Sequence, residues 1–129
     1  MKKKYLIVIA DYYKDISKGL LKSSIDSLPK NCLIKIINVP GVFEIPITIS
    51  KNIKKYDGFL ALGCVIKGQT PHFDFISRSS TDAIMTLAIE NKKPIGNGII
   101  TCLNMKQATA RKKKGREAAE AVVSVLSQK

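Results

Sequence analysis

Residues 5–10 read YLIVIA, an unbroken apolar run. Such a run is typical of a strand buried on both faces, as in a parallel sheet that helices cover on each side. Asp15 follows, and after it come apolar residues at helical spacing: Ile16, Leu20, Leu21, Ile25 and Leu28. We therefore predict a buried strand followed by a helix that Asp15 caps.

The alternation of strand and helix continues along the chain. Further strands are predicted at 32–39 (CLIKIINV), 58–66 (GFLALGCVI) and 94–102 (PIGNGIITC). Helical spacing is found at 45–53, 72–91 and 105–126, with a break in the last segment near 112–115. Right-handed crossovers between such strands give a parallel sheet. The predicted fold class is α/β, a three-layer αβα sandwich around a four-stranded parallel sheet.

Length and charge limit the number of domains and the kind of partner. The chain has 129 residues and no Pro/Gly/Ser-rich linker, so residues 1–129 are predicted to form a single domain. The formal net charge of +12 points to an anionic partner such as RNA. Yet only Arg78, Arg111 and Arg116 carry the guanidinium fork that reads bases. We expect no nucleic-acid partner and keep a small basic RNA-binding protein as the alternative from another class.

The cysteines and the first residues indicate the compartment. Cys32, Cys64 and Cys102 are odd in number and widely spaced, which fits neither a disulfide framework nor a zinc site. The apolar run after MKKK is too short for the core of a signal peptide or for a membrane span. We therefore expect a cytoplasmic protein without a membrane partner.

Functional residues are expected where the strands of a parallel sheet end, because ligands bind beyond these carboxyl ends. Residues 68–72 (GQTPH) join one such end to a helix start, whose free amide groups favour an anion such as phosphate. His72 is the only histidine, and imidazole as a chemical group is suited to proton transfer near neutral pH, so this residue is a candidate general acid–base residue. The alternative is that His72 only occupies a helix N-terminus.

Four other features at these ends have a functional and a structural interpretation. Cys64 is either a nucleophile paired with His72 or, as we favour, a buried core residue. Glu44 either binds hydroxyl groups or favours a helix N-terminus. Tyr12 and Tyr13 either stack on a planar ligand or pack at the surface. The basic run from Arg111 to Arg116 either closes over a phosphate or is a solvated helix end.

Three segments resemble the lumazine synthase family: VPGVFEIP (39–46), ALGCVIKGQTPHFDFIS (61–77) and NMKQATARKKKGREAAEA (104–121). The resemblance implies the lumazine synthase, flavodoxin-like fold and a condensation without cofactor or metal. The substrates would be 5-amino-6-(D-ribitylamino)uracil and 3,4-dihydroxy-2-butanone 4-phosphate, and the product 6,7-dimethyl-8-ribityllumazine. It also implies a homopentamer with active sites between subunits. The alternative within this fold is the similar archaeal-type riboflavin synthase, which dismutates two lumazines.

The resemblance assigns residues to the pyrimidine substrate. Tyr12 matches the ring that stacks on the pyrimidine, with Tyr13 as the alternative. Val42, Phe43 and Glu44 match contacts to the ribityl chain and the ring, and Glu44 accepts from the ribityl hydroxyls. Backbone contacts to the uracil edge match Val65 and Ile66.

The remaining assignments concern phosphate, proton transfer and the second subunit. Gln69 and Thr70 match the phosphate loop, and His72 matches the proton-transfer residue. Asn97 falls where the neighbouring subunit offers a side chain to the ring. Arg111 and Lys114 match the phosphate-side cations of that neighbour.

Overall fold

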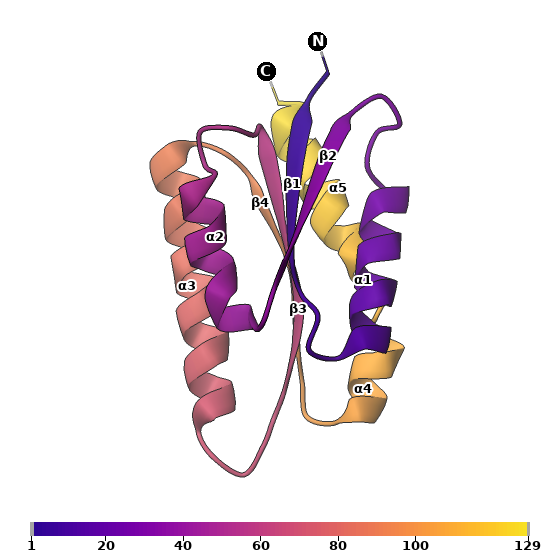
Figure 1. The fold of residues 1–129 in the computed structure, drawn as a ribbon, viewed down its shortest axis with the longest axis vertical. Coiled ribbons are helices and arrows are strands. Elements are labelled where there is room, and N and C mark those ends of the chain that lie inside the picture. Colours follow the sequence, from indigo (N-terminus) through magenta and orange to yellow (C-terminus); the bar gives the residue numbers. More distant parts are fainter. Residues whose placement is uncertain (1, 129) are drawn as a thin grey trace.

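A four-stranded parallel sheet forms the centre of the molecule (Figure 1). The structure is a computed structural model, and it describes residues 2–128 of the chain. The strands are β1 (Lys4–Ala10), β2 (Leu33–Val39), β3 (Gly58–Ile66) and β4 (Ile95–Cys102), in the order β2-β1-β3-β4. All neighbouring pairs are parallel, as the alternation of strands and helices predicts.

Helices cover both faces of the sheet, which confirms the three-layer prediction. Helices α1 (Lys14–Asp26), α4 (Met105–Ala110) and α5 (Gly115–Leu126) lie on one face. Helices α2 (Ile45–Lys51) and α3 (His72–Asn91) lie on the other, after a short 3-10 turn, η1 (Val42–Glu44). The predicted break in the last helical segment separates α4 from α5. No helix within residues 2–128 is long and apolar enough to cross a membrane.

The core consists of two apolar layers, one on each face of the sheet. Every residue from Tyr5 to Ala10 is buried, because β1 lies between two other strands and under helices on both sides. Successive side chains of β3 also enter the two layers in turn. Leu60 and Leu62 pack toward α1 and α5, whereas Phe59 and Ala61 pack toward α2 and α3. Because the side chains inside the central strands are buried on both faces of the sheet, these strands can reach solvent only at their ends.

One expectation about local structure is wrong. Asp15 does not cap α1: the cap position is Tyr13, and Asp15 lies in the first turn, where its carboxylate pairs with Lys112 at 3.4 Å. The helix starts early because the Tyr13 carbonyl accepts both the Ser17 N–H and the Ser17 hydroxyl. The second strand, although apolar, is mostly exposed, because β2 lies at the edge of the sheet.

Strand order determines where a ligand can bind. The chain moves from β1 outward to β2, and then returns to place β3 on the other side of β1. Open α/β sheets have a crevice at such a reversal, beyond the carboxyl ends of the strands. In this molecule that position lies between the ends of β1 and β3, at the lower end of Figure 1.

Candidate active site

A cavity of about 670 Å³ opens at this reversal. Residues from the ends of β1, β2 and β3 and from the start of α3 line it: Tyr12, Tyr13, Gly41, Val42, Phe43, Glu44, Cys64, Val65, Ile66, His72 and Ile76. A volume in the range of about 300–1,000 Å³ is usual for sites that bind a small molecule. Seven of the residues assigned from the sequence therefore meet in one cavity.

Two tyrosine rings after β1 form one wall. The ring of Tyr12 meets that of Tyr13 edge to face, with centroids 4.9 Å apart. Tyr12 is 75% exposed, whereas Tyr13 is half-buried against the core. A largely free ring held at its edge by a fixed one is available for stacking on a planar ligand. The geometry thus favours Tyr12 for stacking and Tyr13 for support.

The turn η1 supplies an apolar and an acidic group to the opposite wall. Val42 is buried and anchors the turn, while the Phe43 ring is 67% exposed. The Glu44 backbone is held on both sides, since its N–H donates to the Gly41 carbonyl at 3.2 Å and its carbonyl accepts from the Thr48 hydroxyl at 2.8 Å. Within residues 2–128 the Glu44 carboxylate has no hydrogen bond or ion pair. It is therefore open to accept hydroxyl donors from a ligand.

The end of β3 exposes backbone groups to the cavity. Pairing with β1 stops at Leu62, whereas pairing with β4 continues to Ile66. Phe59 and Lys67 donate their N–H groups toward the β4 side, at 3.1 and 2.9 Å. Because backbone direction alternates along a strand, the N–H and C=O groups of Cys64 and Ile66 point to the unpaired side. Ile66 thus fits a backbone contact to a ligand, and the groups of Val65 point toward β4.

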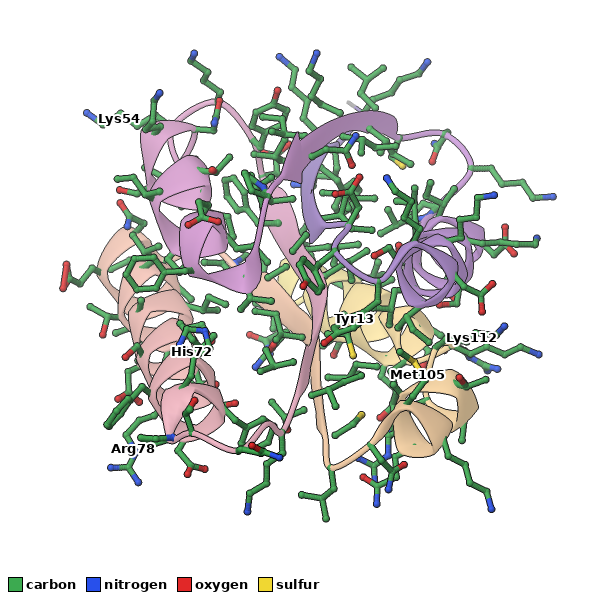
Figure 2. All side chains as sticks on the ribbon, turned by 60° about the horizontal axis from the view of Figure 1, so that its bottom comes forward. Tyr13, Lys54, His72, Arg78, Met105 and Lys112 are labelled. Carbon is green, nitrogen blue, oxygen red and sulfur yellow. The ribbon has the colours of Figure 1, made fainter. Side chains whose placement is uncertain are left out.

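His72 lies at the first position of α3 with an exposed side chain (Figure 2). The Thr70 hydroxyl accepts the backbone N–H of His72 at 3.4 Å, which ties the preceding loop to the helix start. Gln69 and Thr70 are exposed and lie outside the lining of the cavity. The loop therefore lies beside the cavity mouth, where the amides at the N-terminus of α3 favour an anion.

Cys64 lies beneath the cavity and is buried. Burial and the adjacent Cys102 thiol raise the pKa of Cys64 to about 12. The side chain is therefore a neutral thiol at neutral pH, and a thiol is a poor nucleophile. Its environment matches the core interpretation.

We predict that Cys64→Ser retains most of the activity of the protein. The replacement keeps the shape of the side chain, and leaving the buried hydroxyl without good partners costs about 1 kcal/mol of stability. The checks are kcat/KM and the urea midpoint of unfolding. In the wild type, alkylation of Cys64 by iodoacetamide should accelerate roughly tenfold for each pH unit above 8, because the thiolate fraction rises by that factor below the pKa. A covalent substrate adduct on Cys64 would contradict this prediction.

Three assigned residues lie away from the cavity. Asn97 lies within β4, where its side chain accepts the Ile99 N–H at 3.0 Å. Arg111 follows α4 and donates to the Thr101 carbonyl at 3.3 Å. Lys114 pairs with Glu117 at 2.8 Å near the start of α5. One copy of the chain thus holds the pyrimidine-side residues together and leaves these three at its surface.

Sequence reasoning did not assign Gly41, Cys64 and Ile76 to the lining of the cavity. Gly41 lies in the segment VPGVFEIP (39–46), which carries part of the resemblance, and Ile76 lies one helical turn after His72. A residue four positions after a functional residue on a helix faces the same side, and this spacing was the available signal.

Fold and cavity together define a class: α/β proteins that bind a small ligand where the strand order reverses. Residues 2–129 match the family described as 6,7-dimethyl-8-ribityllumazine synthase. A relative of that name from Bartonella henselae is 44% identical over 134 residues, which cover 96% of this chain and 86% of that protein. Another from Agrobacterium fabrum is 41% identical over 137 residues, which cover 96% and 93%.

The chain belongs to this family of lumazine synthases, enzymes of riboflavin biosynthesis. The three sequence segments that carry the resemblance contain the turn after β2, the end of β3 with the start of α3, and the segment from α4 into α5. Two of these segments supply most of the cavity lining, which links the family to the site.

Proposed function

We propose that this protein condenses 5-amino-6-(D-ribitylamino)uracil with 3,4-dihydroxy-2-butanone 4-phosphate to form 6,7-dimethyl-8-ribityllumazine. The observation that carries the proposal is the convergence of an exposed ring, a free carboxylate, open backbone groups and a histidine on one cavity (Tyr12, Glu44, Ile66, His72). Each matches one part of the pyrimidine substrate or of the proton transfer. The reaction releases phosphate and water.

The pyrimidine would lie between the Tyr12 ring and the end of β3. Stacking holds the plane of the ring, and the open backbone groups of Cys64 and Ile66 pair with the polar edge of the uracil. The Glu44 carboxylate accepts from the ribityl hydroxyls. Aligning the amine with the ketone in this way replaces a bimolecular encounter and supplies much of the acceleration.

The chemistry needs proton transfers but no strong nucleophile from the protein. The amine attacks the ketone to give an imine with loss of water, phosphate leaves by elimination, and ring closure releases a second water. His72 lies near the loop expected to hold the phosphate and is positioned to move protons in these steps. Amides of the helix start, with Gln69, Thr70 and the cations Arg111 and Lys114, would stabilise the departing dianion.

We propose that the working unit is a homopentamer whose sites lie between subunits, in the cytoplasm, where the free cysteines stay reduced. The exposed side of α3 supports association: Phe75, Met85 and Ile89 are 65%, 59% and 67% exposed. Together with Arg78 and Asp82, these three residues recur at alternating intervals of three and four positions. This spacing is typical of the contact face of helices that pack side by side. Association would also bring Asn97 and Arg111 of one copy to the cavity of the next.

The direct test mixes the two purified substrates with the protein and follows lumazine fluorescence together with phosphate release. We expect both signals to rise with the same rate, and neither to rise when one substrate is omitted. Light scattering coupled to gel filtration should give a mass near five chains. Riboflavin formation from lumazine alone would instead support the dismutase alternative.

Shared sites predict a specific result for Arg111. We expect Arg111→Ala to weaken the phosphate substrate about ten- to hundredfold, because a charge-assisted contact contributes about 1.5 to 3 kcal/mol. Affinity for the pyrimidine should stay close to that of the wild type. Steady-state KM values for each substrate give the comparison, and equal weakening of both would indicate a structural role.

Mixed assemblies test whether Arg111 acts across the interface. When chains carrying Arg111→Ala and chains carrying His72→Ala are refolded together in equal amounts, about a quarter of the interfaces should combine two intact residues in a cyclic assembly. Activity should then exceed that of either variant alone. No gain on mixing would show that both residues serve the same copy of the chain.

A further inference from the structure

The end of the sheet opposite the candidate site carries lysines at every strand. The amino ends of the strands lie at the top of Figure 1. The lysines in or just before these ends, here called the amino-end lysine patch, are Lys3, Lys4, Lys30, Lys35, Lys54, Lys55, Lys92 and Lys93. Lys93 is half-buried and the others are exposed. Figure 2 shows Lys54 at the upper edge of the view, away from His72 and Tyr13. The patch is therefore separate from the catalytic proposal.

Within the described residues, these lysines form no ion pair. The ion pairs within residues 2–128 all lie on α1, on the turn before it, on the segment that leads into α5, or within α5, and none includes a lysine of the patch. The nearby Asp57 carboxylate accepts the backbone N–H of Lys4 at 2.8 Å. Lys93 donates its Nζ to the Ile53 carbonyl at 2.7 Å. Uncompensated like charges repel one another, and an anionic partner relieves that repulsion.

The outer edge of β2 lies beside the patch and is open. Leu33, Ile34 and Ile36 are 48%, 37% and 39% exposed, and β2 has a neighbouring strand on one side only. The Leu33 N–H donates to the Lys3 carbonyl at 2.9 Å, which fixes the direction of the backbone. By alternation, the N–H and C=O groups of Ile34 and Ile36 point away from β1. An open apolar edge of this kind is a template for another strand.

Patch and edge meet in one hollow. A cavity of about 340 Å³ is lined by Lys4, Leu33, Ile34, Lys35, Lys55 and Tyr56. Ammonium groups, aliphatic side chains and unpaired backbone groups thus lie together at this one cavity. This combination matches a ligand that itself has carboxylates, aliphatic side chains and a peptide backbone.

We propose that the open edge of β2 and the amino-end lysine patch bind an extended acidic polypeptide segment of another protein, which adds a strand to the sheet. Carboxylates of that segment form ion pairs with Lys35 and Lys55, and its backbone forms hydrogen bonds with the outward N–H and C=O groups of Ile34 and Ile36. Nucleic acid fits this surface less well. No arginine belongs to the patch, and the one aromatic side chain among the described residues that line its cavity, Tyr56, is half-buried. The exposed aromatic rings of the described chain, Tyr12, Phe43 and Phe75, lie at the other end of the sheet.

The test measures fluorescence anisotropy of a labelled peptide of alternating glutamate and valine with the full-length protein. The same peptide with N-methylated backbone amides and a thymidine oligonucleotide serve as comparison probes. We expect saturable binding of the first peptide that weakens with salt, and much weaker binding of the N-methylated form. Hydrogen exchange at Ile34 and Ile36 should slow in the complex.

Two sets of variants separate charge from strand pairing. We expect Lys35→Glu with Lys55→Glu to weaken the peptide at least roughly tenfold, since two attractive charge contacts become repulsive. The control, Lys18→Glu with Lys106→Glu, changes the net charge equally at exposed sites outside the patch and should have little effect. Ile36→Pro removes only an outward N–H, which an edge strand tolerates, and should weaken the peptide more than Ile36→Ala does.

The outcomes decide the proposal. Binding that falls with the patch variants and with Ile36→Pro, while lumazine formation stays unchanged, supports it. Equal loss in the charge control shows only a general attraction of a basic protein and overturns it. Tighter binding of the oligonucleotide at the same lysines would assign the surface to nucleic acid instead. Circular dichroism of each variant confirms that the fold is intact.

Discussion

Replacing His72 by alanine should lower kcat for lumazine formation by about a hundredfold without abolishing it. General acid–base catalysis contributes roughly a hundred- to ten-thousandfold, and alignment of the reactants in the cavity is independent of the imidazole. Water can take over part of the proton transfer because His72 is exposed. Single-turnover measurements at saturating substrate separate this step from binding, and KM for both substrates should change little.

Two controls show whether the effect is chemical. Added imidazole should restore part of the rate in His72→Ala, which a merely structural role of the side chain would not allow. Asp74→Asn alters a neighbouring exposed charge in the first turn of α3, outside the lining of the cavity. It should leave kcat nearly unchanged. Complete loss of activity in a folded His72→Ala protein would show that the residue does more than transfer protons.

The largest expected effect on stability comes from Gly115→Ala. Gly115 starts α5 and is buried against α1, where a Cβ atom would overlap the Leu20 carbonyl oxygen and lie 2.8 Å from the Ser23 hydroxyl. Backbone cannot yield as a side-chain end does, so the two helices must move apart. We expect a loss of about 3 kcal/mol in the free energy of unfolding.

The matched control makes the same chemical change where there is space. Gly68 has no atom within 4 Å of the position of an added Cβ, and no glycine of the described chain has a positive φ. Gly68→Ala should therefore keep or slightly raise the stability, because alanine restricts the unfolded chain. Urea unfolding of both variants gives the comparison. Equal stability of Gly115→Ala and the wild type would mean that α1 and α5 are not in close contact.

Much of the fold could be predicted from the sequence because its signals are local. The run YLIVIA and its later counterparts are strand patterns, and the helical spacing between them leaves the parallel sheet as the consistent solution. The same reasoning placed the candidate site, since the carboxyl ends of parallel strands meet at one edge. Tyr12, Glu44 and His72 follow from that rule, Ile66 was assigned through the resemblance, and all four line the cavity.

Other features depended on which elements are neighbours, and local patterns do not contain that information. The apolar sequence at 33–39 looks as buried as β1, but the strand order puts it at the edge, where its side chains are exposed. Gly115 is an ordinary helix residue in the sequence, and only the packing of α5 against α1 makes it indispensable.

The sequence by itself determined the succession of strands and helices, the reaction class through its motifs, and the residues at the strand ends. The tertiary structure alone decided which of these residues share a cavity, and it left Gln69, Thr70, Asn97, Arg111 and Lys114 outside its lining. It also decided that lysines in or just before all four strands gather at one end of the sheet. The physical reason is that backbone preference acts over a few residues, whereas burial, edge position and charge clustering arise from contacts between segments far apart in the chain.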